Sequence, residues 1–174
     1  MSLFLIGMRG AGKTTLGARL AARLGVPFLD SDRLLEEQSG LGVAELFRTR
    51  GEGAFRALER ELLLELAPRP GQLLATGGGC VLDPEVRAGL RRHGHVVWLT
   101  APLAVLAARV RAGAPRPSLT GADPADELAA VLAVREPLYR ACAHTTLDTS
   151  RLAPDEVTDV LEQLWTLSPH HHVR

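Results

Sequence analysis

Short apolar runs alternate along the chain with longer segments in which apolar positions recur at helical spacing. The short runs predict five buried strands, at residues 3–7, 26–29, 72–76, 95–100 and 144–149. The longer segments predict helices at residues 13–24, 43–67 (broken near Gly51–Gly53), 102–111, 125–142 and 154–165, and one more that Asp83 caps. Strands that alternate with helices form βαβ units. The pattern therefore predicts an α/β protein, with a five-stranded parallel sheet between two layers of helices.

The composition fits one domain and excludes several classes of protein. The chain has 174 residues, 46% of them apolar, which suits one domain over residues 1–167 and a polar tail at 168–174. Its formal net charge is zero, so no basic excess points to nucleic acid or to a membrane surface. No apolar run approaches the ~18 residues of a membrane span. Cys80 and Cys142 are too few for a disulfide framework, so we expect a reduced, cytoplasmic protein.

The segment GMRGAGKT, residues 7–14, lies between the first predicted strand and its helix. It matches the phosphate-binding pattern G-x-x-x-x-G-K-[ST]. The glycines let backbone N–H groups approach phosphate oxygens, and the helix that begins at Lys13 points its positive dipole end at the same anion. Thr14 offers a hydroxyl to Mg²⁺. The segment therefore predicts a nucleoside triphosphate site beyond the carboxyl end of the first strand.

Lys13 is the only lysine of the chain, which uses arginine at every other basic position. The planar guanidinium of arginine favours side-on, two-pronged partners, whereas this position needs a compact charge that reaches the β- and γ-phosphates. The same count argues against a GTP-binding switch protein, because the Asn-Lys-x-Asp segment that commonly binds guanine would need a second lysine.

Two other predicted strands end in residues suited to a substrate. The second ends in FLDSD, where Asp30 and Asp32 can both project toward the terminal phosphate. One acid could hold Mg²⁺ through water, and the other could accept the proton of a substrate hydroxyl. Helix capping is the alternative, and it explains one acid better than two. The third strand ends in three glycines, Gly77 to Gly79, which indicate either a close approach to the backbone or a mobile loop.

Three arginines stand out among those of the chain. Arg116 lies in the Gly/Pro-rich segment 112–124, which predicts a loop that could fold over the nucleotide and stabilise the transferring phosphoryl group. Arg56 and Arg135 lie on predicted helices. On residue type alone, both fit a solvated helix face as well as a binding site.

Taken in order, these pieces resemble the shikimate kinases, a family with the nucleoside-monophosphate-kinase-like P-loop fold. The resemblance runs from about Leu3 to Leu164. It is carried by the phosphate-binding segment and by FLDSD, GExxFRxxE, TGGG, RP, REPLYR and TSR. It implies a single kinase domain over 1–167, with a mobile lid at about 112–124 and a substrate-binding segment at about 31–62. The expected reaction moves the γ-phosphoryl group of ATP to the 3-hydroxyl of shikimate.

The resemblance also assigns roles on the nucleotide side. The phosphates of ATP would be held by Gly10, Ala11, Gly12, Lys13, Thr14 and Thr15. Mg²⁺ would be ligated by Thr14 and approached by Asp30 through water. Arg116 would act from the lid on the phosphates, and Arg109 and Arg151 would line the adenine.

On the acceptor side, the resemblance implies that Asp32 hydrogen-bonds the ring hydroxyls and acts as the base. Arg56 and Arg135 would grip the shikimate carboxylate, and Gly77, Gly78 and Gly79 would pack against the ring, with Gly78 offering its N–H. ATP and shikimate are then the expected partners, without nucleic acid or membrane, and a monomer is expected.

Two departures and two rival functions stay open at this point. The chain has RPSL after Pro115 where RPLL is expected, which makes the placement of Arg109 less firm than that of Lys13. Cys80 follows the glycines where a small residue is expected, and it fits either a reactive thiol or a small buried side chain. The rivals are another small-metabolite kinase, such as a gluconate kinase, and a non-catalytic nucleotide-binding module.

Overall fold

The structure, a computed structural model, describes residues 2–112 and 124–167. Its centre is a five-stranded sheet in the order β2-β3-β1-β4-β5, with every pairing parallel. The strands are β1 (Leu3–Ile6), β2 (Phe28–Asp30), β3 (Leu73–Ala75), β4 (His95–Thr100) and β5 (Thr145–Asp148). All four residues of β1 are buried, because this strand is central and covered on both faces. The predicted parallel sheet is confirmed.

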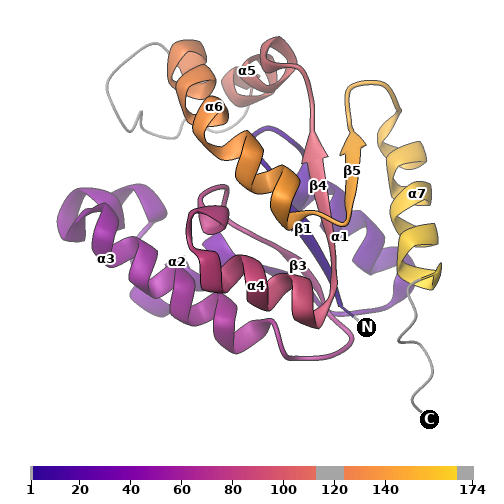
Figure 1. Cartoon of the computed structure of the whole chain (residues 1–174), viewed down its shortest axis with the longest axis horizontal. Helices are drawn as coiled ribbons and strands as arrows, with labels where there is room; N and C mark the ends of the chain where they lie inside the picture. The colour runs from indigo at the N-terminus through magenta and orange to yellow at the C-terminus, as the bar shows by residue number, and fades with distance from the viewer. Residues whose placement is uncertain (1, 113–123, 168–174) are drawn as a thin grey trace.

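Helices cover both faces of the sheet (Figure 1). They are α1 (Lys13–Leu24), α2 (Ser31–Ser39), α3 (Val43–Leu66), α4 (Pro84–His93), α5 (Leu103–Ala112), α6 (Pro124–Cys142) and α7 (Pro154–Leu167), with a 3₁₀ turn, η1 (Cys80–Leu82). Helices α1 and α7 pack together on one face, whereas α4 and α6 pack on the other against β4. None of the helices in the described part of the chain is long and apolar enough to cross a membrane.

Local sequence signals explain most helix ends. Asp83 caps α4 by accepting the backbone N–H groups of Glu85 and Val86 at 2.8 and 2.9 Å, as its position before Pro84 predicts. Helix α3 is interrupted at Gly51, whose backbone is not helical, which confirms the predicted break. Helix α2 was not predicted, because its nine residues are mostly polar and bury only Ser31 and Leu35.

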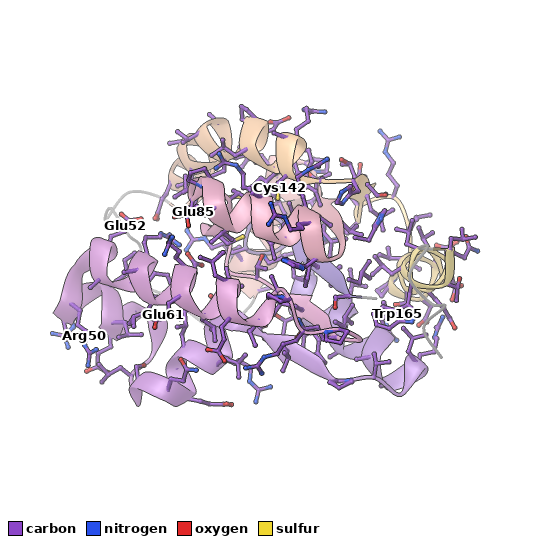
Figure 2. All side chains as sticks on the ribbon, turned by 60° about the horizontal axis from the view of Figure 1, so that its bottom comes forward. Arg50, Glu52, Glu61, Glu85, Cys142 and Trp165 are labelled. Atoms are coloured by element: carbon purple, nitrogen blue, oxygen red, sulfur yellow. The ribbon has the colours of Figure 1, made fainter. Side chains whose placement is uncertain are left out.

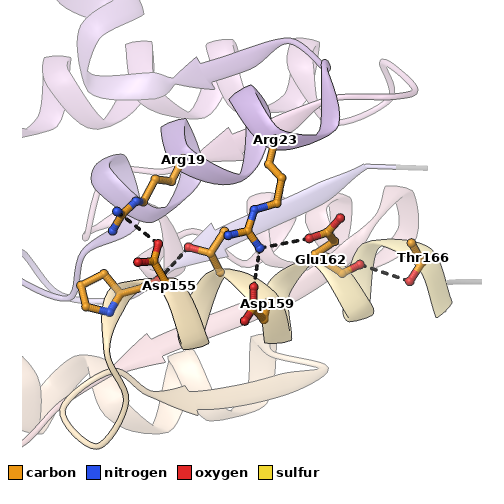
Figure 3. A network of polar contacts seen from close by, with 8 residues as sticks. Arg19, Arg23, Asp155, Asp159, Glu162 and Thr166 are labelled. Atoms are coloured by element: carbon orange, nitrogen blue, oxygen red, sulfur yellow. Dashed lines mark hydrogen bonds and ion pairs between the residues drawn. The ribbon is translucent and has the colours of Figure 1, made fainter.

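A charged network fastens α7 against α1 (Figure 3). Arg19 of α1 lies 3.2 Å from Asp155, and Arg23 contacts both Asp159 and Glu162, the latter at 3.1 Å. These carboxylates lie on one face of α7. Since α1 begins at the phosphate-binding segment, the network helps to fix the position of the helix that starts there.

Most charged side chains of the described residues lie on the surface, and most large apolar ones are buried. Figure 2 shows Arg50 and Glu61 on the outer surface of α3, where both are exposed. Trp98 and Trp165 are 3% and 5% exposed, so both belong to the core. The carboxyl ends of the parallel strands are left as the edge where loops and helix N-termini gather.

Candidate active site

The segment 7–14 forms a tight loop from the end of β1 to the start of α1. At Gly7 (φ 138°) a Cβ atom would lie 2.2 Å from the carbonyl oxygen of Leu99, so only glycine fits this close approach. Gly12 precedes the helix with φ 94° and has no side chain to cap it. The first backbone bond of α1 runs from Leu16 N–H to the Gly12 carbonyl at 2.8 Å. The amides before Leu16 therefore point out of the helix N-terminus, where an anion binds favourably.

Lys13 lies at the mouth of this loop. Its ammonium group donates to the carbonyl oxygens of Gly7 at 2.7 Å and Met8 at 3.1 Å. The charge is thereby held beside the helix N-terminus instead of extending into solvent. A phosphate over the loop would meet both the ammonium and the helix dipole.

Asp30 both caps a helix and accepts a hydrogen bond from a hydroxyl group. Its Oδ1 accepts the backbone N–H groups of Asp32 at 3.1 Å and Arg33 at 3.4 Å, as the N-cap of α2. Its Oδ2 accepts the hydroxyl of Thr14 at 2.7 Å. A hydroxyl paired with a carboxylate is an oxygen donor set of the kind that Mg²⁺ prefers, with water and phosphate completing the shell. The pair fits a nucleotide-bound Mg²⁺.

The three glycines after β3 each face a different charged group. A Cβ atom on Gly77 would lie 2.3 Å from Oε1 of Glu59 and 2.7 Å from Oδ1 of Asp32, and one on Gly79 would lie 2.2 Å from a guanidinium nitrogen of Arg56. The corresponding position on Gly78 is 3.5 Å from a guanidinium nitrogen of Arg135. Close approach of side chains therefore explains the triplet better than loop mobility does. One short loop brings together the three side chains predicted to bind substrate.

Arg56 is held in a defined position on α3. It donates to Oε2 of Glu59 at 2.5 Å, and its guanidinium carbon lies 5.5 and 5.2 Å from the ring centroids of Phe47 and Phe55. A guanidinium fixed by a carboxylate and by aromatic rings is pre-organised for a second anion. A cavity of about 250 Å³ opens beside it, lined among others by Arg56, Glu59 and Gly79.

Glu59 is the site residue to which the sequence assigned no role. Its side chain is 3% exposed, and Oε1 has no hydrogen-bond partner within the described structure. Burial raises the pKa of this carboxyl group and the charge of Asp32 raises it further, against the lowering effect of Arg56 and Arg135. Its spacing of three residues from Arg56 on one helix was the available signal.

The predicted nucleotide-side arginines are placed differently from one another. Arg109 donates to the hydroxyl and carbonyl oxygens of Thr149, each at 2.8 Å, and to the Gly10 carbonyl at 3.3 Å, so it joins the phosphate loop to the end of β5. Arg151 is 83% exposed and lies 3.3 Å from Asp148. Arg116 and most of the predicted lid, 112–124, lie outside the described residues.

Cys80 has the surroundings of a core residue. Its thiol is buried, and its sulfur lies 3.2 Å from the hydroxyl oxygen of Thr76. Burial raises the pKa of the thiol, which disfavours the reactive thiolate. Of the two sequence interpretations, the structure favours the small buried side chain.

The fold and the site define the class as a P-loop kinase that acts on a small anionic metabolite. The family model described as shikimate kinase matches residues 9–165, and the chain belongs to the shikimate kinase family. A shikimate kinase of Symbiobacterium thermophilum is 43% identical over 94% of this chain and 96% of its own length. A shikimate kinase 2 of Syntrophotalea carbinolica is 45% identical, with 90% and 91% of the two chains covered.

Solved structures agree with the sequence relatives. The shikimate kinase from Acinetobacter baumannii in complex with shikimate has a TM-score of 0.88 and 38% identity, over 95% of this chain and 92% of that one. A gluconokinase from Sinorhizobium meliloti has a TM-score of 0.58 and 19% identity, with 94% and 89% covered. The gluconokinase shares the fold, whereas family membership sets this chain apart from the gluconate kinase alternative and from a non-catalytic module.

Proposed function

We propose that this chain transfers the γ-phosphoryl group of ATP to the 3-hydroxyl of shikimate, giving shikimate 3-phosphate and ADP. The observation that carries the residue assignment is the glycine triplet, which places Asp32, Arg135 and Arg56 around one loop. Shikimate is a ring with one carboxylate and three hydroxyls. Two guanidinium groups suit the carboxylate, and an aspartate suits the hydroxyls.

The donor end of the reaction is assigned to the phosphate loop and its neighbours. Backbone amides of residues 10–15 and the ammonium of Lys13 hold the phosphates. Thr14 and Asp30, whose hydroxyl and carboxylate are in contact at 2.7 Å, would hold Mg²⁺. When bound, Mg²⁺ supplies positive charge at the β- and γ-phosphate oxygens. Arg109 and Arg151 are assigned to the adenine, and Arg116 to the phosphates from the lid at 112–124.

The acceptor end is assigned to residues of α2, of the glycine loop after β3, of α3 and of α6. Arg56 and Arg135 bind the carboxylate, and the Gly78 N–H contacts the ring. Asp32 orients the 3-hydroxyl and takes its proton as the oxygen attacks phosphorus. The new O–P bond forms while the bond from γ-phosphorus to the bridging oxygen breaks, so that ADP leaves with the electron pair.

The remaining parts of the proposal concern organisation. We assign residues 1–167 to one kinase domain, 31–62 to substrate binding and 168–174 to a tail. We expect a monomer in the cytoplasm. Analytical sedimentation of the purified chain, with and without both substrates, tests whether its oligomeric state is that of a monomer.

The test of the function is ADP release by the purified chain with ATP and Mg²⁺, offered shikimate or gluconate. Shikimate should support turnover, whereas gluconate should give only the background of ATP hydrolysis. Asp32→Ala should abolish turnover and keep ATP binding, while Glu37→Ala, an exposed change on the same helix, should keep wild-type activity. Equal turnover with gluconate, or an active Asp32→Ala variant, would contradict the proposal.

A further inference from the structure

Tyr139 is a buried side chain between the two halves of the site, and it has no role in the account so far. It is the only tyrosine of the chain, lies on α6 and is 0% exposed. Its ring stacks on Trp98 of β4, with centroids 5.7 Å apart and planes 19° from parallel. This packing fixes the direction in which the phenol hydroxyl points.

The hydroxyl of Tyr139 contacts both the glycine triplet and the phosphate loop. It donates to the carbonyl oxygen of Gly78 at 2.5 Å, and it lies 3.6 Å from the sulfur of Met8, which follows Gly7 in the phosphate loop. The guanidinium of Arg135, one helical turn earlier on α6, lies near this hydroxyl, since a Cβ atom on Gly78 would lie 3.5 Å from a guanidinium nitrogen of Arg135 and 3.6 Å from the Tyr139 oxygen. The hydroxyl of Tyr139 therefore contacts the glycine triplet and the phosphate loop, and it lies near a candidate carboxylate-binding arginine.

These contacts constrain the acceptor pocket more than the donor loop. Gly78 and Arg135 are both assigned to shikimate, and the Tyr139 hydroxyl donates to the Gly78 carbonyl and lies near the Arg135 guanidinium. Met8, by contrast, offers only a thioether, which is a weak acceptor. Removing the hydroxyl would leave the Gly78 carbonyl without this donor and would free the Arg135 guanidinium to adopt other rotamers.

We propose that Tyr139 is a positioning residue for the acceptor, setting the Gly78 peptide and the Arg135 guanidinium at the separation that the shikimate carboxylate and ring require. The inference rests on the proposed function, because it takes both groups as shikimate contacts. The residue acts through its neighbours and exchanges no proton with substrate. Burial raises the pKa of the phenol, so the hydroxyl keeps its proton across the working range of pH.

The experiment is Tyr139→Phe, which keeps the ring and its stacking on Trp98 and removes only the hydroxyl. The dissociation constant of shikimate, measured by calorimetry without nucleotide, should rise about tenfold, and KM for shikimate should rise with it. We expect kcat and KM for ATP to stay within about twofold of wild type. The matched control is Thr158→Val, which removes a buried hydroxyl bonded to Pro154 of α7, away from the acceptor pocket.

The outcomes separate this inference from the proposed function. Wild-type turnover with shikimate tests the function alone, whereas the ratio of variant to wild-type affinity tests Tyr139. If Tyr139→Phe and Thr158→Val both lower the melting temperature and both leave shikimate affinity unchanged, Tyr139 is only a packing residue and the inference is wrong.

A second measurement decides the question if Tyr139→Phe fails to fold. Because the chain has one tyrosine, growth on 3-fluorotyrosine places a single ¹⁹F label beside this hydroxyl. Saturating shikimate should shift the resonance, because the shikimate carboxylate would bind the Arg135 guanidinium, which lies near the Tyr139 hydroxyl. A resonance that does not move with shikimate would overturn the inference.

Discussion

Gly79→Ala tests the acceptor pocket with the smallest possible change. The backbone at Gly79 has φ −94° and ψ −4°, which alanine adopts readily, so the substitution introduces no backbone strain. Its only new atom, a Cβ, would lie 2.2 Å from one guanidinium nitrogen of Arg56 and 2.3 Å from the guanidinium carbon. The substitution therefore acts on Arg56 rather than on the fold.

The size of the effect follows from how far Arg56 must move. Ordinary contact between such atoms begins near 3.5 Å, so the guanidinium must retreat by roughly 1.3 Å or more. Glu59 and two phenylalanine rings hold it where it is. A charge-assisted hydrogen bond to a bound carboxylate contributes about 1.5–3 kcal/mol, so its loss should raise KM for shikimate about 10- to 100-fold.

The assay couples ADP release to oxidation of NADH while shikimate and ATP are varied in turn. KM for ATP should stay within about twofold, because the added atom lies away from the phosphate loop. Gly53→Ala is the control, since a Cβ there meets no atom within 4 Å. If Gly79→Ala leaves KM for shikimate within twofold of wild type, the placement of Arg56 in the acceptor pocket is wrong.

Three further predictions concern charge. Glu59→Gln should raise KM for shikimate because Arg56 loses its anionic anchor. The melting temperature of the variant should be no lower than that of wild type. Burial raises the pKa of the Glu59 carboxyl group, so its ionised form destabilises the fold as pH rises through that pKa. Arg23→Ala should lower the melting temperature by loosening α7, and the difference should shrink in high salt. Wild-type stability should fall as pH drops below about 6.5, because burial lowers the pKa values of His95 and His144 and the unfolded chain takes up those protons first.

Each of these has a control on the same chain. Glu61→Gln is an exposed change on the helix of Glu59 and should leave KM unchanged. Arg48→Ala breaks only an exposed pair within α3, so a loss of stability equal to that of Arg23→Ala would refute the role of the α1–α7 network. A combined His95→Gln and His144→Asn variant should flatten the pH dependence, whereas exposed His93→Gln should not. A wild-type slope in the combined variant would rule out the histidine pair.

The sheet and the phosphate loop were predictable because their signals are local. Apolar runs and a glycine pattern of fixed spacing need no knowledge of distant residues, so five strands and the start of α1 at Lys13 are where the sequence indicates. Helix α2 was not predicted, because its short sequence is mostly polar and its first turn is organised by the Asp30 cap. Few apolar residues over nine positions do not identify a helix whose first turn depends on one capping carboxylate.

The acceptor pocket was only partly predictable, because contacts between distant segments determine which residues form it. The residue types of Arg56 and Arg135 left solvated faces open, and only the folded loop brings them to Gly79 and Gly78. Glu59 and Tyr139 look like ordinary helix residues in the sequence. Their roles depend on burial and on partners contributed by other elements, which spacing alone does not encode.

A crystal structure with shikimate and a non-hydrolysable ATP analogue with Mg²⁺ tests the central claim most directly. The account predicts the 3-hydroxyl oxygen within about 3.5 Å of the γ-phosphorus, with Asp32 on that hydroxyl and the ring carboxylate between Arg56 and Arg135. A shikimate carboxylate bound away from both arginines, or a 3-hydroxyl turned from the phosphate, would contradict it.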